Sequence, residues 1–68
     1  MVYEKIADYM EQNGISQSFI CKKTGMSKNA VSLSLRGERN IMADEFIGIC
    51  NALNVEPNQF MDDLERVS

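Results

Sequence analysis

Apolar residues recur at spacings of three and four along most of the chain, and this period is that of an α-helix. Between Val2 and Gln12 the apolar side chains gather on one side of such a helix and the charged side chains on the other. The pattern predicts five helices, at Val2 to Gln12, Gln17 to about Lys23, Lys28 to Arg36, about Met42 to Leu53, and from Pro57 onward. We therefore expect one all-α domain over residues 1–68, a compact five-helix bundle.

The helix boundaries carry their own signals. Ser16 and Ser27 can each accept a hydrogen bond from the free backbone N–H groups of a helix start. The left-handed conformation that ends a helix suits Asn13-Gly14, Gly25, Gly37 and Asn54. Residues 30–35 alternate apolar and polar side chains, which is typical of a strand. A lone strand cannot satisfy its backbone hydrogen bonds, so we predict a helix there as well.

Two short predicted helices flank Gly25. The helix from Gln17, the turn over residues 24–26 and the helix that ends at Arg36 have the spacing of a helix-turn-helix. Such a turn needs one residue at positive φ, which Gly25 can supply. Cys21 is small enough for the point where the two helices cross, and we expect Met26 and Val31 to fill the wedge between them.

The third predicted helix has an outward side suited to reading DNA bases. Its outward positions are Lys28, Asn29, Ser32, Leu33 and Arg36. Lysine can donate to guanine, asparagine can pair with adenine, serine can bond to either kind of base edge, and leucine can pack on a thymine methyl group. Gln17 can bring its amide and a free backbone N–H to a phosphate. The alternative is an ordinary solvated helix face, against which an exposed Leu33 would be the exception.

The stretch from Ile15-Ser16-Gln17 through Gly25-Met26-Ser27 to Arg36-Gly37-Glu38-Arg39-Asn40 resembles the lambda-repressor/Cro-like (XRE-type) helix-turn-helix family. Residues 46–55 resemble that family's fourth helix and its cap, and the likeness covers about residues 3–63. The resemblance implies a transcriptional regulator, in the first place a repressor, that binds operator half-sites in double-stranded DNA as a homodimer. The DNA-contact residues expected on this basis are Gln17, Ser27, Lys28, Asn29, Ser32, Leu33, Arg36, Arg39 and Asn40. Ser34 departs from the family, which commonly has an apolar residue there.

The formal net charge of −3 argues against nucleic acid until it is divided by position. Residues 15–40 hold five Lys or Arg and one Glu, for a charge of +4, and the rest of the chain carries −7. The positive charge therefore coincides with the helix-turn-helix, where it suits phosphate. If all five cations contacted phosphate, the logarithm of the affinity would fall against the logarithm of the salt concentration with a slope of about −4.5 per monomer.

The C-terminal region offers a dimer interface. Phe60, Met61 and Leu64 exceed what one inner helix face can bury, and a dimer through them would hold two recognition helices about 34 Å apart. The alternative is that Phe60 and Met61 only close a thin core. A second hypothesis for the function is an antitoxin-like or adaptor protein that acts mainly on another protein; such a protein need not bind DNA at low salt.

Other chemistry has little support. We expect no enzyme, cofactor or small-molecule substrate, because the chain has no histidine, no paired-carboxylate pocket and no glycine-rich phosphate loop. Two cysteines without histidine cannot supply a four-ligand zinc site, so we expect no metal either, and Cys21 and Cys50 are predicted to be reduced core residues. The absence of a long apolar run favours a cytoplasmic protein that has no contact with membranes. The family resemblance implies that it is of bacterial or phage origin.

Overall fold

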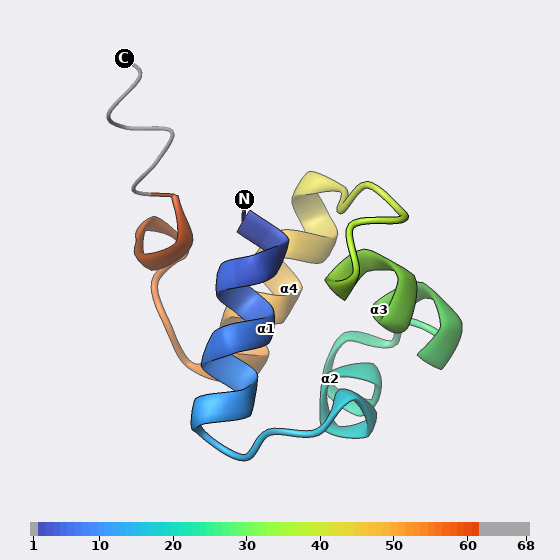
Figure 1. Cartoon of the computed structure of the whole chain (residues 1–68), viewed down its shortest axis with the longest axis horizontal. Coiled ribbons are helices and arrows are strands. Elements are labelled where there is room, and N and C mark those ends of the chain that lie inside the picture. Colours follow the sequence, from blue (N-terminus) through green and yellow to red (C-terminus); the bar gives the residue numbers. More distant parts are fainter. Residues whose placement is uncertain (1, 62–68) are drawn as a thin grey trace.

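The computed structural model describes residues 2–61 and forms a small helical bundle (Figure 1). Its elements are α1 (Val2–Gln12), α2 (Gln17–Thr24), α3 (Lys28–Leu35), α4 (Ala43–Leu53) and the 3-10 turn η1 (Pro57–Phe60). Within the described part of the chain no segment is a strand, and the helix predicted for residues 30–35 is confirmed. In Figure 1, α2 and α3 lie on one side of α1 and α4, and η1 lies on the opposite side.

The prediction of a fifth α-helix from Pro57 is wrong for the described residues, which contain four α-helices and a four-residue 3-10 turn. In this turn the Gln59 N–H donates to the Glu56 carbonyl at 3.0 Å, and the Met61 N–H donates to Asn58 at 3.1 Å. These three-residue bonds make a tighter coil that is stable in short pieces. Apolar spacing alone does not separate it from the first turn of an α-helix. Leu64 lies outside the described residues.

The caps predicted from the sequence are in place. Ser16 Oγ accepts the Phe19 N–H at 3.1 Å, and Ser27 Oγ accepts the Ala30 N–H at 3.0 Å. Asn54 ends α4 in the left-handed conformation, with φ of 59°. Each cap thus satisfies backbone groups that a helix end leaves free.

Met42, which the apolar pattern placed near the start of the fourth helix, is instead the residue before α4 and is 58% exposed. Its backbone is extended, with ψ of 158°. The carboxylate of Glu45 accepts the Met42 N–H at 3.0 Å, so the helix start is stabilised one residue later than the pattern suggested. Asp44 and Glu45 also place negative charge in the first turn of α4, where the helix dipole favours it.

One hydrophobic core joins all five elements. It consists of Ile6, Met10, Ile20, Val31, Leu35, Ile49, Cys50, Leu53 and Phe60. Phe60 is 3% exposed and meets Tyr9 and Phe46 edge to face, with ring centroids 5.8 Å and 6.5 Å apart. The turn η1 therefore closes the core against α1 and α4, which is the alternative role considered for Phe60.

The helix-turn-helix is held by α1 and α4. α2 packs against both α3 and α4, and α1 packs against α3. At Gly37, just after α3, a side-chain carbon would lie 2.5 Å from Tyr3 Cζ. Gly37 also has φ of 78°, so both the backbone and the contact with α1 require glycine there.

Gly48 lies inside α4 facing α2, and a methyl group added there would sit 3.6 Å from Thr24 Cγ2. That is an ordinary van der Waals distance, so alanine should fit without moving α2. We expect Gly48→Ala to raise the free energy of unfolding by about 0.5–1 kcal/mol, because glycine costs that much inside a helix. Urea denaturation followed by circular dichroism measures the change.

Gly25→Ala is the matched control, since the space around Gly25 is also open. Its φ of 79° is left-handed, however, so alanine should lower the free energy of unfolding by about 1–2 kcal/mol. A loss of stability in Gly48→Ala would show that the α2–α4 contact is tighter than the structure indicates.

Candidate nucleic-acid interface

The turn between α2 and α3 is held by its own hydrogen bonds. Gly25, at φ of 79°, ends α2 and donates its N–H to the Cys21 carbonyl at 2.9 Å. Thr24 Oγ1 donates to the Ile20 carbonyl at 2.7 Å and accepts the Met26 N–H at 3.2 Å. The predicted helix-turn-helix is therefore present, and its turn has little freedom to change the angle between the two helices.

Helix α3 presents a polar end. Ser27 caps it, and Lys28 and Asn29 occupy its first two positions with exposed side chains. Ser32 lies one turn further on and is half-buried. The Ser27 cap fixes the start of α3, and its Val31 is buried in the core at 1% exposed. The backbone that carries these polar side chains is therefore held in place.

Leu33 differs from its prediction as an exposed leucine, because it is half-buried. The chain reverses at Gly37, and the Glu38 N–H returns to the Leu33 carbonyl at 2.9 Å. The turn after α3 is therefore tied to the backbone of Leu33. A half-buried leucine calls for a partner less than an exposed one does.

The remaining predicted contact residues lie around the ends of α2 and α3. Gln17 is the first residue of α2 and is half-buried, and Asn40 is exposed in the loop before α4. Arg36 pairs with Glu38 at 3.0 Å, with both side chains more than half exposed. Such an exposed pair is weak, so Arg36 can exchange Glu38 for a phosphate at little cost.

Arg39 is placed differently from the other cations of this region. Its guanidinium forms a two-pronged bond with the Glu45 carboxylate, from Nη1 to Oε1 at 2.8 Å and from Nη2 to Oε2 at 2.7 Å. Nη1 also donates to Ser34 Oγ at 3.1 Å and to the Asn40 carbonyl at 3.4 Å. The Arg39 side chain is 33% exposed and that of Glu45 is 18% exposed.

This arrangement shifts the titration of both partners. The hydrogen bonds from Arg39 and from the Met42 N–H lower the pKa of Glu45 to about 2, against an ordinary value of 4.5. The hydrogen bond to Glu45 raises the pKa of Arg39. Glu45 is therefore ionised throughout the range in which proteins work, and it neutralises Arg39 at close range.

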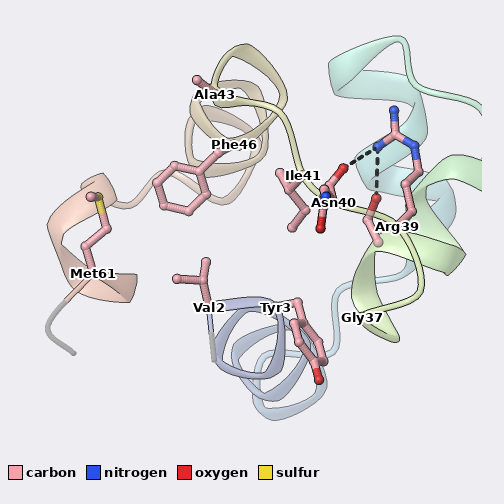
Figure 2. Close-up of a pocket in the computed structure, with 10 residues that line it drawn as sticks. Val2, Tyr3, Gly37, Arg39, Asn40, Ile41, Ala43, Phe46 and Met61 are labelled. Atoms are coloured by element: carbon pink, nitrogen blue, oxygen red, sulfur yellow. Dashed lines mark hydrogen bonds between the residues drawn. The ribbon is translucent and has the colours of Figure 1, made fainter. Parts of the chain in front are cut away.

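An apolar cleft of about 570 Å³ lies beside this pair (Figure 2). Figure 2 shows Val2, Phe46 and Met61 at one end of the cleft and Arg39 with Asn40 at the other. Met61 is half-buried, while the adjacent Phe60 has too little exposed surface to serve as a contact with another molecule. Of the residues predicted to form the dimer interface, Met61 alone is both described and accessible to another molecule. It lies in the apolar cleft.

Two features escaped sequence reasoning. The first is the set Ser34, Arg39 and Glu45; its signal was a serine on the inner side of α3, because a buried hydroxyl needs a partner. The second is Phe19 on α2, which is 39% exposed and lies 5.6 Å from the Lys23 ammonium group. Nothing in the helical pattern separates this ring from a core aromatic.

Cys21 and Cys50 are both free, and burial raises the pKa of the Cys50 thiol. Among residues 2–61 no three His, Cys, Asp or Glu side chains come together in a way that could hold a metal ion. The helices in this range are also too short and too polar for one to cross a membrane.

A helix-turn-helix family model matches residues 6–60, most of the chain. No curated protein and no solved structure matches the chain significantly. The match covers α2, the turn and α3 together with the α4 helix that packs on α2.

The Glu45–Arg39 pair predicts a specific dependence of stability on pH. Because folding lowers the pKa of Glu45, its ionised form adds stability above pH 4.5, and that stability is lost as the pH falls toward 2. We expect Glu45→Gln to be less stable than the wild type at pH 7 and nearly equal to it close to pH 2. Thermal unfolding across this pH range provides the comparison.

Glu38→Gln is the control, because it removes the same charge from a pair whose members are both more than half exposed. Its stability should follow that of the wild type at every pH. If Glu45→Gln also followed the wild type, the Arg39–Glu45 pair would not contribute to the fold in solution.

Proposed function

The chain belongs to the Cro-like helix-turn-helix family, whose members are DNA-binding regulators, and we propose that it is a sequence-specific transcriptional repressor. In this proposal the chain acts as one DNA-binding domain, and α3 reads operator half-sites in the major groove of double-stranded DNA. The proposal requires no cofactor and no small-molecule substrate, and its place of action is the bacterial cytoplasm.

The observation that carries the proposal is the exposed polar start of α3. In helix-turn-helix proteins, the N-terminal residues of the second helix contact base edges in the major groove. Lys28 and Asn29 occupy those positions here, directly after the Ser27 cap. Both side chains can bond to purine edges, lysine to guanine and asparagine to adenine.

Phosphate contacts would surround this reading end. Gln17 and Ser27 stand at the starts of α2 and α3, where free backbone N–H groups favour an anion. Arg36 and Asn40 follow α3 and are exposed. The negative charge of the rest of the chain would then limit non-specific binding and favour one docking orientation.

We propose that a second copy of the chain docks at the apolar cleft beside Met61, to form the homodimer that a two-fold operator requires. Val2, Ile41 and Phe46 line this cleft together with Met61. Hydrophobic clefts of this kind favour a protein partner when they remain open in a monomer.

A protein partner other than a second copy is the alternative function. Phe19 and Ile47 are exposed by 39% and 48% and would suit an antitoxin-like or adaptor protein. Affinity for DNA separates the two functions, because a protein that acts only on proteins should not bind duplexes at low salt. Selection of bound duplexes from a random pool reports both the affinity and the half-site spacing.

We expect Lys28→Ala and Asn29→Ala each to cost about 1–3 kcal/mol of binding free energy on the selected duplex. Each variant should also lose discrimination at a single base pair, because each side chain reads one base edge. Binding to duplexes changed at one position at a time measures this loss. Asn51→Ala, which removes an exposed amide on α4, should bind as the wild type does.

The triple variant Gln17→Ala, Lys28→Ala, Asn29→Ala tests the assigned face as a whole. If it still selected and bound the wild-type duplex, α3 would not be the reading helix. The triple variant should still fold, because Lys28 and Asn29 are exposed and Gln17 is only half-buried. Its fold can be checked before the binding experiment.

For the dimer, we expect Met61→Asp to shift the protein toward monomer, because it places a charge in the apolar cleft. Sedimentation at several concentrations measures the dissociation constant. Gln59→Asp is the matched control, since Gln59 is exposed on the same turn. If Met61→Asp associated as strongly as the wild type, the dimer interface would not lie at this cleft.

A further inference from the structure

Arg39 stands apart because three segments meet at its side chain. Its guanidinium bonds to Ser34 on α3, to the Asn40 carbonyl in the following loop, and to Glu45 on α4. Glu45 in turn accepts the N–H of Met42, at the start of α4. Two of the bonds made by Arg39 are drawn in Figure 2.

Ser34 makes this link specific. Its side chain faces the interior of the bundle, and the residue is 1% exposed. A hydroxyl buried to that degree needs a hydrogen-bond partner, which the Arg39 guanidinium supplies at 3.1 Å. The polar residue on the inner side of α3 and the cation in the loop thus account for each other.

The backbone contacts show why such a link matters. α3 packs against α1 and α2, and α4 packs against α2 and η1, but α3 and α4 have no close backbone contact with each other. The bridge from Ser34 through Arg39 to Glu45 is therefore a direct side-chain connection between the two helices. It acts at the C-terminal end of α3, while the turn at Gly25 fixes the N-terminal end.

We propose that Arg39 is a positioning residue: the link Ser34–Arg39–Glu45 orients the recognition helix against α4 and holds Asn40 in place, and Arg39 itself contacts no phosphate. This inference rests on the proposed DNA binding. It also changes the role that resemblance to the family gave Arg39, which was that of a DNA-contact residue.

The charge balance supports the same role. Glu45 neutralises Arg39 through two bonds of less than 3 Å, whereas Lys22 and Lys28 are exposed and take part in neither the Arg39–Glu45 nor the Arg36–Glu38 ion pair. If Arg39 contacts no phosphate, four of the five cations in residues 15–40 remain available for phosphate contacts. The salt dependence should then not exceed a slope of about −3.6 per monomer, since each phosphate contact contributes about −0.9.

The decisive variant is Arg39→Lys, which keeps the charge but removes the planar fork. Lysine serves as a point charge for phosphate but cannot reproduce a two-pronged bond to a carboxylate and a further bond to a hydroxyl. We expect Arg39→Lys to lose about tenfold in affinity for the selected duplex. Asn51→Ala, the control at an exposed residue of α4 with no assigned DNA contact, should stay within about twofold of the wild type.

The salt dependence provides a second and independent measurement. Arg39→Ala should bind about tenfold more weakly with an unchanged salt slope, because no phosphate contact is lost. Arg36→Ala should flatten the slope by about 1. Wild-type affinity in Arg39→Lys, or a slope reduced by about 1 in Arg39→Ala, would overturn the positioning role.

Ser34→Ala serves as the second variant in case the Arg39 variants do not fold, because it leaves both charges in place. It should lose affinity by a few-fold without a change in slope, and wild-type affinity in this variant would count against the link.

Amide hydrogen exchange of the free protein tests the link without DNA. Arg39→Lys should exchange faster than the wild type at residues 34–42, and unchanged exchange would overturn the link by itself. If the wild type bound no duplex at any salt concentration, the proposed function would fall, whatever the exchange showed.

Discussion

The reversal of the chain at Gly25 is the constraint on which the rest of the structure depends. A left-handed residue at this point lets Ile20 of α2 and Val31 of α3 enter the same core, where each is 1% exposed. Once these two side chains are buried, the helical period places Asn29 on the side of α3 away from Val31, and Lys28 stays exposed at the first position of the helix, before the buried turn begins. The exposure of Asn29 is thus a consequence of how the turn is made.

A core of this size cannot fix every angle by burial alone. A chain of 68 residues buries a smaller share of its surface than a larger domain does, so fewer apolar contacts are available to hold each helix. Here the backbone of α3 packs closely against α1 and α2, and a polar bridge through Arg39 links it to α4. A network of satisfied hydrogen bonds has strict distances and angles, so it can hold an orientation even where its net contribution to stability is small.

The parts that could be predicted from the sequence depend on neighbours along the chain. Ser27 caps α3 and Asn54 ends α4 as expected, because a cap is decided within three or four residues. The errors have a different origin. Met42 fits the apolar spacing of the predicted fourth helix, yet α4 begins after it at Ala43, because the Glu45 carboxylate holds the Met42 N–H. The role of Arg39 depends on Ser34 and Glu45, which come together only in the folded chain.

The two arginines that follow α3 show why formal charge alone does not locate a nucleic-acid interface. Arg36 and Arg39 count equally in the sum of +4 over residues 15–40, and each has a carboxylate within 3 Å. For Arg36 both members of the pair are mostly exposed, so water competes for them and a phosphate can replace Glu38. For Arg39 a phosphate would have to displace the bonds to Glu45 and Ser34 together. It would leave a carboxylate that is 18% exposed and a buried hydroxyl without their partner. The cost of separating these groups, rather than the sign of the charge, decides which arginine is available to DNA.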